Sequence, residues 1–317
     1  MKAIEYPSKG SKEFANLVDD YKSIFSTDLA DRVTKRGKKR LGLESKWKNW
    51  KRKYGCIRAL NNSVEDLLTM DFEDLVLFYE TFLRVCSKKR FTSKSLHDLH
   101  EIFKYTNKYD SKISAFFKRH ADELKIYTCH YCDMAYINVY TENSKSIAKS
   151  QFDIDHFLPK GKCPPVALPL FNFVPSCPVC NERIKREDLP YVNLNELKFL
   201  SPSSFAFDLH KRIKVKLGHS KSSRKDFIYF VAKYPYDRYV DFFHLQERYD
   251  YHKIEALRLE KLKKNYSRSQ IAQIAKCLHR TKKEVKEDIF NQRYMQNCHR
   301  CFAKFTIDIL KEPSFEG

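Results

Sequence analysis

The chain has 317 residues, with 60 Lys and Arg against 40 Asp and Glu, and a formal net charge of +20. This excess favours a polyanionic partner, and nucleic acid before an anionic membrane surface, because no basic amphipathic helix with a clean apolar face is evident. A basic surface kept for solubility or for an acidic protein is the alternative that charge alone leaves open. At this length the chain could fold as one domain or as several modules.

No apolar run approaches the ~18 residues that a membrane-spanning helix needs, and the N-terminal sequence lacks the apolar region of a signal peptide. We therefore expect a cytoplasmic protein with no membrane partner. Of the 10 cysteines, four form two Cys-x-x-Cys pairs. Without an export signal, this spacing favours metal ligation over disulfides.

Residues 1–125 are predicted to be a helical region. No proline occurs between Pro7 and Pro159, so helices are not interrupted there. Ser63 and Asp66 form a predicted capping box before an apolar stripe at helical spacing, which breaks near Met70.

The segment Arg32–Lys53, here called the basic arm, holds 11 Lys or Arg and a single acid, Glu44. Aromatic residues interleaved with cations favour contact with nucleic acid. The alternative is that the aromatic side chains form the apolar stripe of an amphipathic helix packed on the core, with the lysines outward. The residues of the arm predicted to contact nucleic acid are Trp47, Trp50, Lys51 and Arg52.

Two Cys-x-x-Cys pairs, Cys129 with Cys132 and Cys177 with Cys180, flank the middle of the chain. This spacing lets two thiolates reach one ion at about 2.3 Å, so the four cysteines are predicted to hold a structural Zn²⁺. The alternative is four buried thiols without a metal.

Between these pairs, alternating residues in Phe152–His156 predict a strand with Asp153 and Asp155 on one face and His156 on the other. Hydrolysis of a phosphodiester needs a base to activate water and a cation to stabilise the leaving oxygen. His156 can be the base, and Asp155 and Asn181 can be oxygen ligands of Mg²⁺ or Mn²⁺. A histidine near a strand end is more often structural, so the combination with the cysteine pairs carries this hypothesis.

These motifs resemble the HNH endonucleases, whose ββα-metal core is two strands and a helix around one catalytic metal. The resemblance implies that Asp155 is a metal ligand and His156 the general base. It implies that Asn172 positions the base or its loop, and that Asn181 is the last metal ligand. The Gly-Gly that usually follows the Asp-His-Pro segment is missing here. Nucleic-acid contacts in this region are expected from Lys160 and Lys185.

The order of FDIDHFLPK, LFNFVPSCPVCN, SPSSFAFD and HLQERYDYHK is similar to the HNH subunits of Septu-type and retron-associated anti-phage systems. This similarity implies a toxic effector nuclease held by an ABC-type ATPase, with a retron reverse transcriptase and its DNA as further partners. Residues 1–120 and 239–310 would then dock the ATPase, unless they only enlarge the core and grip substrate. A rival hypothesis is an inactive, zinc-dependent nucleic-acid-binding module, and the sequence does not distinguish DNA from RNA.

Residues 201–317 are predicted to be mainly helical, with a short strand between Asp208 and Tyr234, where Ile213, Val215 and Leu217 alternate, and helices near Tyr239 and over about 269–292. The pair Cys298 and Cys301 lies in a helical pattern and is expected to pack as small apolar side chains, with a second zinc as the alternative. The predicted fold is α+β and predominantly helical, with a zinc-clamped nuclease core at 126–200 between helical flanks.

Overall fold

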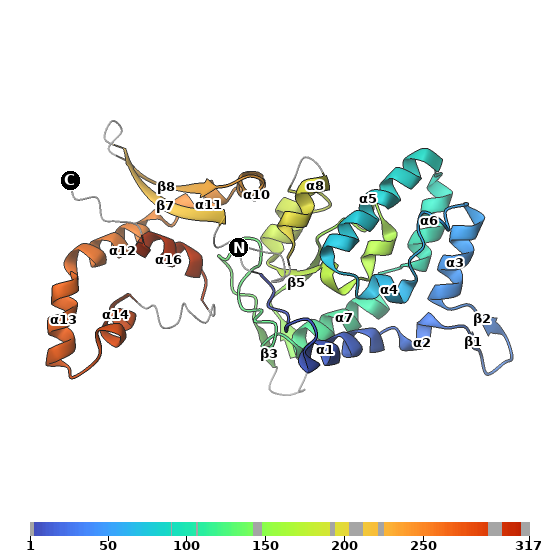
Figure 1. Ribbon diagram of the computed structural model, residues 1–317, viewed down its shortest axis with the longest axis horizontal. Helices are drawn as coiled ribbons and strands as arrows, with labels where there is room; N and C mark the ends of the chain where they lie inside the picture. Colours follow the sequence, from blue (N-terminus) through green and yellow to red (C-terminus); the bar gives the residue numbers. More distant parts are fainter. Residues whose placement is uncertain are drawn as a thin grey trace.

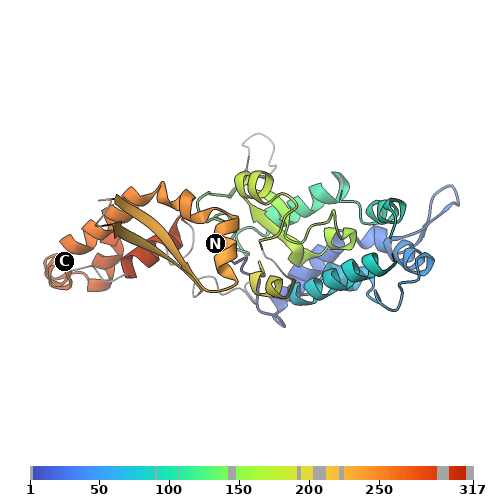
Figure 2. The same ribbon diagram turned by 90° about the horizontal axis from the view of Figure 1, so that it is seen from above.

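The computed structural model describes residues 3–89, 91–105, 107–141, 148–190, 194–202, 212–220, 225–290 and 300–311. The molecule is elongated, with the N-terminal helices at one end and the C-terminal helices at the other (Figures 1 and 2). Helices predominate in the described residues, and the strands pair into small antiparallel sheets of two strands each. The prediction of a mainly helical protein with some β-structure is therefore confirmed. None of the described helices is both long and apolar enough to cross a membrane.

The N-terminal lobe is built from helices that pack their apolar faces on one core. The capping box is confirmed, because the Ser63 side chain accepts from the backbone of Asp66 and the Asp66 side chain accepts from that of Ser63. The break that the sequence predicts near Met70 separates two helices. The elements are α1 (Lys12–Ser23), α2 (Ser26–Leu29), β1 (Arg32–Val33), β2 (Lys39–Arg40), α3 (Leu43–Lys53), α4 (Val64–Leu68), α5 (Phe72–Lys89), α6 (Ser93–Ile102) and α7 (Asn107–Arg119).

Both tryptophans of the basic arm belong to the core. Trp47 and Trp50 are 0% and 3% exposed, and their rings stack at 5.4 Å. Their indole N–H groups donate to the carbonyls of Asn62 and Ser95, each at 3.0 Å. The amphipathic-stripe interpretation is thus confirmed, and the prediction that these rings contact nucleic acid is wrong.

Lys51 is also removed from solvent. Its ammonium group donates to the carbonyl of Asn62 at 2.7 Å and lies over the Trp47 ring at 4.8 Å. Since only 6% of Lys51 is exposed, the prediction that it contacts nucleic acid is wrong as well. Arg52, the next residue of α3, is exposed.

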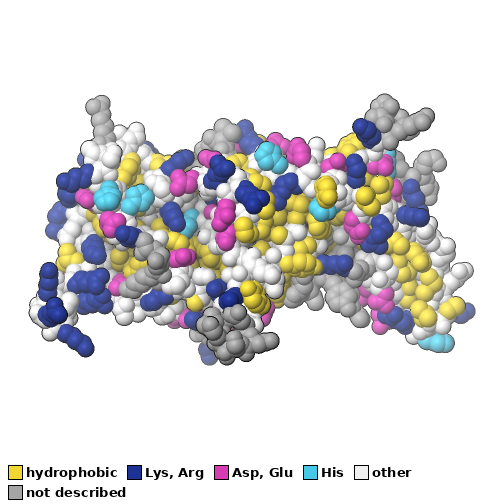
Figure 3. Space-filling view, turned by 180° about the vertical axis from the view of Figure 1, so that it is seen from behind, with side chains coloured by type: hydrophobic (Ala, Val, Ile, Leu, Met, Phe, Trp, Pro, Cys, Tyr) yellow, Lys and Arg dark blue, Asp and Glu magenta, His cyan; other side chains and the backbone are white. Residues whose placement is uncertain are grey.

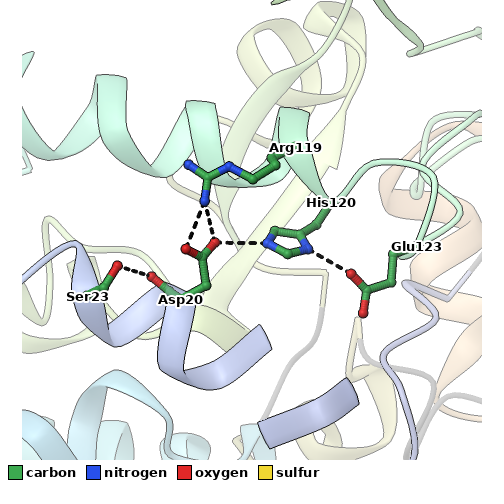
Figure 4. A network of polar contacts seen from close by, with 5 residues as sticks. All are labelled: Asp20, Ser23, Arg119, His120 and Glu123. Atoms are coloured by element: carbon green, nitrogen blue, oxygen red, sulfur yellow. Dashed lines mark hydrogen bonds and ion pairs between the residues drawn. The ribbon is translucent and has the colours of Figure 1, made fainter. Parts of the chain in front are cut away.

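A polar cluster joins α1 to the end of α7 (Figure 4). Arg119 donates to both carboxylate oxygens of Asp20, at 2.8 and 2.6 Å. The His120 ring lies between two carboxylates, with Nε2 at 2.9 Å from Asp20 and Nδ1 at 2.7 Å from Glu123. The Ser23 hydroxyl donates to the backbone carbonyl of Asp20 and not to His120. Both nitrogens of His120 are therefore occupied, and the cluster holds two helices together.

The middle of the chain is short strands and tight turns, as its six prolines between Pro159 and Pro178 require. The strand predicted at Asp153–His156 is confirmed and pairs antiparallel with a second strand, so that Asp155 lies opposite Val174. The elements are β3 (Val139–Thr141), β4 (Ala148–Ser150), β5 (Asp153–His156), the 3-10 turns η1 (Pro164–Ala167) and η2 (Leu170–Asn172), β6 (Phe173–Ser176), the π-helical η3 (Val179–Lys185), α8 (Leu194–Leu197) and the 3-10 turn η4 (Lys198–Leu200).

The C-terminal lobe places a long hairpin beside a group of helices (Figure 1). The predicted strand is confirmed and longer than expected, and its partner β8 was not predicted. The single helix predicted over about 269–292 is two helices, separated where His279 adopts φ 49°. The elements are β7 (Ile213–Ser220), β8 (Lys225–Ala232), α10 (Tyr236–Phe242), α11 (Leu245–Asp250), α12 (Lys253–Asn265), α13 (Arg268–Cys277), α14 (Lys282–Phe290) and α16 (Ala303–Lys311).

Of the last cysteine pair, the structure describes Cys301, and Cys298 lies outside the described residues. Cys301 lies in a turn before α16, so it is not in a helix as the pattern predicted. It is a half-buried free thiol.

Candidate metal centre and active site

The four cysteines of the two Cys-x-x-Cys pairs converge on one point. Their sulfur atoms all lie within 4.8 Å of one another, and all four side chains are buried. A tetrahedral Zn²⁺ with Zn–S distances of about 2.3 Å needs its sulfurs roughly 3.8 Å apart, so the cluster is compatible with zinc. The predicted metal-binding residues Cys129, Cys132, Cys177 and Cys180 are thus brought together as one candidate metal site.

The local backbone is shaped to hold these sulfurs as thiolates. The N–H of Cys177 donates to the Cys129 sulfur at 3.3 Å, and the N–H of Met134 donates to the Cys132 sulfur at 3.4 Å. Asp133 closes the first turn at φ 57°. Burial raises the pKa of the Cys129 thiol well above its usual range, whereas hydrogen bonds with the neighbouring thiols lower the pKa of Cys132, so a bound cation would keep Cys129 deprotonated as well.

The C-terminal lobe docks directly on this cluster. Arg248 of α11 donates to the Cys180 sulfur at 3.4 Å and to the carbonyl of Phe243 at 3.2 Å. The hydroxyl of Tyr239 donates to the carbonyl of Tyr131, and that of Tyr249 donates to the carbonyl of Cys132. These contacts were not predicted, although Arg248 and Tyr249 lie in the HLQERYDYHK segment that the sequence singles out.

His156 ends β5 and is almost fully buried. Its Nε2 lies 3.0 Å from the carbonyl oxygen of Ala167. Because a carbonyl only accepts, Nε2 carries the proton of the neutral ring and Nδ1 holds the free lone pair. Burial lowers the pKa of His156 well below its usual range, and the charge of Lys160 lowers it further. The ring is therefore a neutral imidazole at pH 7, with Nδ1 able to accept a proton.

Asn172 is fully buried and fixes the loop that follows His156. Its side-chain oxygen accepts from the N–H of Leu158 at 2.7 Å. Its amide donates to the carbonyl of Leu158 at 3.0 Å and to that of Val166 at 2.7 Å. Asn172 thereby holds the segment leading to Ala167, the hydrogen-bond partner of the His156 ring.

Asp155 points to the opposite face of β5 and is 5% exposed. Its carboxylate accepts from the Tyr131 hydroxyl and lies 3.1 Å from the ammonium group of Lys185. Lys185 also donates to the carbonyl of His156 at 2.9 Å. Burial raises the pKa of Asp155, and Lys185 and Tyr131 oppose that rise.

Lys185 is 0% exposed, so it is buried against Asp155 in this structure. The prediction that Lys185 contacts nucleic acid is therefore wrong. Lys160, in contrast, is half-buried and lies over the Tyr105 ring at 4.4 Å, and that ring packs edge-on against His156. The structure thus places Lys160 beside His156.

Asn181 and Asp153 carry oxygen donors of the kind that hard divalent cations prefer, in the two elements that the Asp155–Lys185 pair joins. Asn181 is half-buried in η3, four residues before Lys185. Asp153 lies on the same face of β5 as Asp155, and one of its carboxylate oxygens is buried with no hydrogen-bond partner among the described residues. Mg²⁺ and Mn²⁺ accept one or two carboxylates with amide and water oxygens, so the donor set fits, but a cation at Asp155 would compete with Lys185. In the described part of the chain, the cysteine cluster alone brings three or more ligand side chains of the His, Cys, Asp and Glu types together.

No family model, curated protein or solved structure matches this chain.

Proposed function

We propose that this chain is a metal-dependent endonuclease of the HNH type, which hydrolyses phosphodiester bonds of nucleic acid. The observation that carries the proposal is the state of His156. Its imidazole is neutral, its Nε2 proton is held by the Ala167 carbonyl, and its Nδ1 is free to accept a proton, beside a hairpin anchored by four cysteines. A general base at neutral pH needs these properties.

In this mechanism His156 Nδ1 takes the proton of the attacking water. The carbonyl of Ala167 stabilises the imidazolium that forms, since it accepts from Nε2 throughout. Asn172 keeps that carbonyl in place through its hydrogen bonds to the loop. Zn²⁺ on the cysteine cluster would fix the first knuckle, Cys129–Cys132, relative to η3, which carries Cys180. Mg²⁺ or Mn²⁺, when bound by Asp155 and Asn181, would supply the charge that stabilises the leaving oxygen.

A cleavage assay tests the proposal. Purified protein is incubated with plasmid, single-stranded DNA and total RNA, with Mg²⁺, with Mn²⁺ and with chelator. His156→Ala is expected to abolish cleavage while zinc content and the melting transition stay unchanged. His97→Ala, at an exposed histidine on α6, is the matched control and should cleave like the parent protein. Full activity of His156→Ala, or loss of its zinc, would show that His156 is not the base.

The second candidate is an inactive, zinc-dependent nucleic-acid-binding module. The Asp155–Lys185 ion pair favours it, because the carboxylate already has a cationic partner. The triple variant Asp155→Asn, His156→Ala and Asn181→Ala separates the two functions. If this variant retains the biological effect of the parent chain, the binding module is the correct reading.

We also propose that the nuclease is the toxic effector of an anti-phage system, restrained by an ABC-type ATPase and associated with a retron reverse transcriptase and its DNA. The support is the sequence similarity together with the net charge of +20, which gives non-specific affinity for nucleic acid and makes an unrestrained nuclease harmful. Co-expression with the neighbouring ATPase and size-exclusion chromatography test this partnership. Separate elution, with toxicity unaffected by the ATPase, would exclude it.

A further inference from the structure

The β1–β2 hairpin projects from the end of the N-terminal lobe, and every residue of 30–41 is exposed (Figure 1). Six of these residues are Lys or Arg, and a single one, Asp31, is acidic. Seen from behind, dark-blue side chains stand out from this end of the molecule (Figure 3). A two-stranded ribbon without a packed face is only marginally stable in water, so this ribbon is suited to a partner outside the lobe.

The strand register places like charges opposite one another. Arg32 lies directly across from Arg40 on one face of the ribbon, and Val33 lies across from Lys39 on the other face. Like charges at directly opposed positions destabilise an antiparallel pair. The ribbon therefore carries cations on both faces. A bound anion would relieve the repulsion between the opposed Arg32 and Arg40 side chains.

Few of these charges are neutralised within the protein. Asp28 lies 3.7 Å from Arg32, and Asp31 lies 3.3 Å from Lys39. In the part of the chain that the structure describes, no carboxylate lies within ion-pair distance of the remaining four cations. These four are Lys35, Arg36, Lys38 and Arg40.

A cavity of about 160 Å³ lies at the foot of the ribbon. Four cationic and two acidic side chains line it. The two carboxylates pair with two of the cations, Asp28 with Arg32 and Glu101 with Lys104. The other two cations lack such a partner among the described residues. The cations are Arg32, Arg40, Lys46 and Lys104.

A residue that lines this cavity is followed in the chain by a residue that contacts His156. Lys104 lines the cavity, and the next residue, Tyr105, packs its ring edge-on against His156 with centroids 4.6 Å apart. Consecutive Cα atoms are about 3.8 Å apart, so the cavity lining and the contact with His156 come from neighbouring residues of the chain. The ammonium group of Lys160 lies over the same Tyr105 ring, 4.4 Å from its centroid.

We propose that the β1–β2 ribbon enters a groove of a double-helical nucleic acid, and that the cavity at its foot binds a backbone phosphate of the strand that reaches His156. Cations on both faces of the ribbon match a position between two phosphate backbones, and a major groove admits a two-stranded ribbon. The inference rests on the proposed nuclease function and names its substrate class as a duplex. DNA and RNA helices share this backbone chemistry and differ in groove width.

Equilibrium binding tests the inference without turnover. The His156→Ala protein is titrated against a labelled DNA duplex, an RNA duplex and a single strand of the same length, at several salt concentrations. In the ribbon variant, Lys35, Arg36, Lys38 and Arg40 are each changed to Ser. For a duplex, the slope of log affinity against log salt should fall by about 3 to 4, because each phosphate contact contributes about 0.9. Affinity at fixed salt should fall at least about tenfold, and by less for the single strand.

The matched control changes four exposed lysines of the C-terminal lobe to Ser and removes the same charge. It should bind within about twofold of the parent protein at moderate salt, where charges beyond a Debye length are screened. An equal loss in both variants would mean that net charge alone governs binding, and an equal loss on the single strand would exclude the groove. The duplex, DNA or RNA, for which the ribbon variant loses more affinity is the one that the ribbon binds. These binding results do not depend on whether the parent protein cleaves nucleic acid. The control positions are Lys261, Lys276, Lys282 and Lys286.

Discussion

The ammonium group of Lys185 lies 3.1 Å from a carboxylate oxygen of Asp155, and both side chains are almost completely shielded from solvent. The pair joins η3 to β5, two elements that also carry Asn181 and His156. A buried ion pair adds little net stability, because desolvation offsets the attraction, but removal of one partner leaves an uncompensated charge. This pair therefore controls both the stability of the hairpin and the availability of Asp155 to a cation.

Lys185→Met is expected to destabilise the fold by about 3–5 kcal/mol, since the Asp155 carboxylate would remain buried without its cation. Urea unfolding of the single variant measures the loss. The double variant Asp155→Asn, Lys185→Met should recover much of it, because neither charge remains. Equal stability of the single and double variants would contradict the argument.

Asn172→Asp is expected to cost roughly 2–6 kcal/mol at neutral pH, because two buried carbonyls lose their donor at about 1–3 kcal/mol each. The two carbonyls disfavour an ionised carboxylate beside them, so the folded-state pKa of the new carboxyl would be raised. The loss should therefore shrink as pH falls, when the protonated carboxyl can donate again. Unfolding curves at two pH values measure this, with Asn49→Asp at an exposed site of α3 as the control. A loss of unfolding free energy that does not change with pH would show that the hydrogen bonds donated by the Asn172 amide do not cause it.

Cys129→Ser and Cys180→Ser are expected to lose zinc and with it the cooperative fold of 126–200, since the free energy of zinc binding in such sites is also folding free energy. Zinc per chain and the melting temperature report both effects. Cys277→Ser, at an exposed cysteine, should match the parent protein. Soluble cluster variants with a full zinc content would remove the structural-zinc hypothesis.

Arg248→Met should weaken zinc retention by about 10- to 100-fold, because groups that hydrogen-bond to metal ligands tune affinity to this extent. The rate of zinc transfer to a chelator measures retention. Arg258→Met is the control, since Arg258 is paired with Glu255 on the surface of α12. If the two variants release zinc at the same rate, the contact between Arg248 and the Cys180 sulfur has no effect on the site.

His156 should make the fold less stable in acid. Burial lowers its pKa in the folded chain, whereas the unfolded chain titrates near about 6.5. Below that pH the unfolded state binds a proton that the folded state does not, so unfolding is favoured as pH falls. The free energy of unfolding should drop between about pH 7 and pH 5, by at most about 1.4 kcal/mol per pH unit from this group. His156→Gln should remove this slope and His97→Gln should keep it.

What the sequence predicted well was determined by local chemistry. The spacing of Cys129 and Cys132, matched by a second pair after 44 intervening residues, indicates a metal knuckle, and the alternation around Asp155 indicates a strand whatever its partner. The position of Lys185 was not predictable in this way. Whether Lys185 faces solvent or a buried acid depends on where β5 lies, and Asp155 of β5 is 30 residues earlier in the chain. The burial of Trp47 is similar, since Asn62, which binds its indole, lies beyond the helix that carries it.

The two tyrosine hydroxyls of the C-terminal lobe bind backbone carbonyls of Tyr131 and Cys132 and no side chain of the first knuckle. Hydrogen bonds of this kind depend on the course of the main chain, which a metal on the four cysteines would fix, and do not depend on the side chains of the residues whose carbonyls accept them. These two hydrogen bonds would survive a substitution at Tyr131, although the Tyr131 ring also stacks on Phe243 of the same lobe and its hydroxyl binds Asp155. Docking of the C-terminal lobe through these hydroxyls therefore depends on the turn of the first knuckle, and Tyr239 and Tyr249 are expected to stay unchanged between relatives.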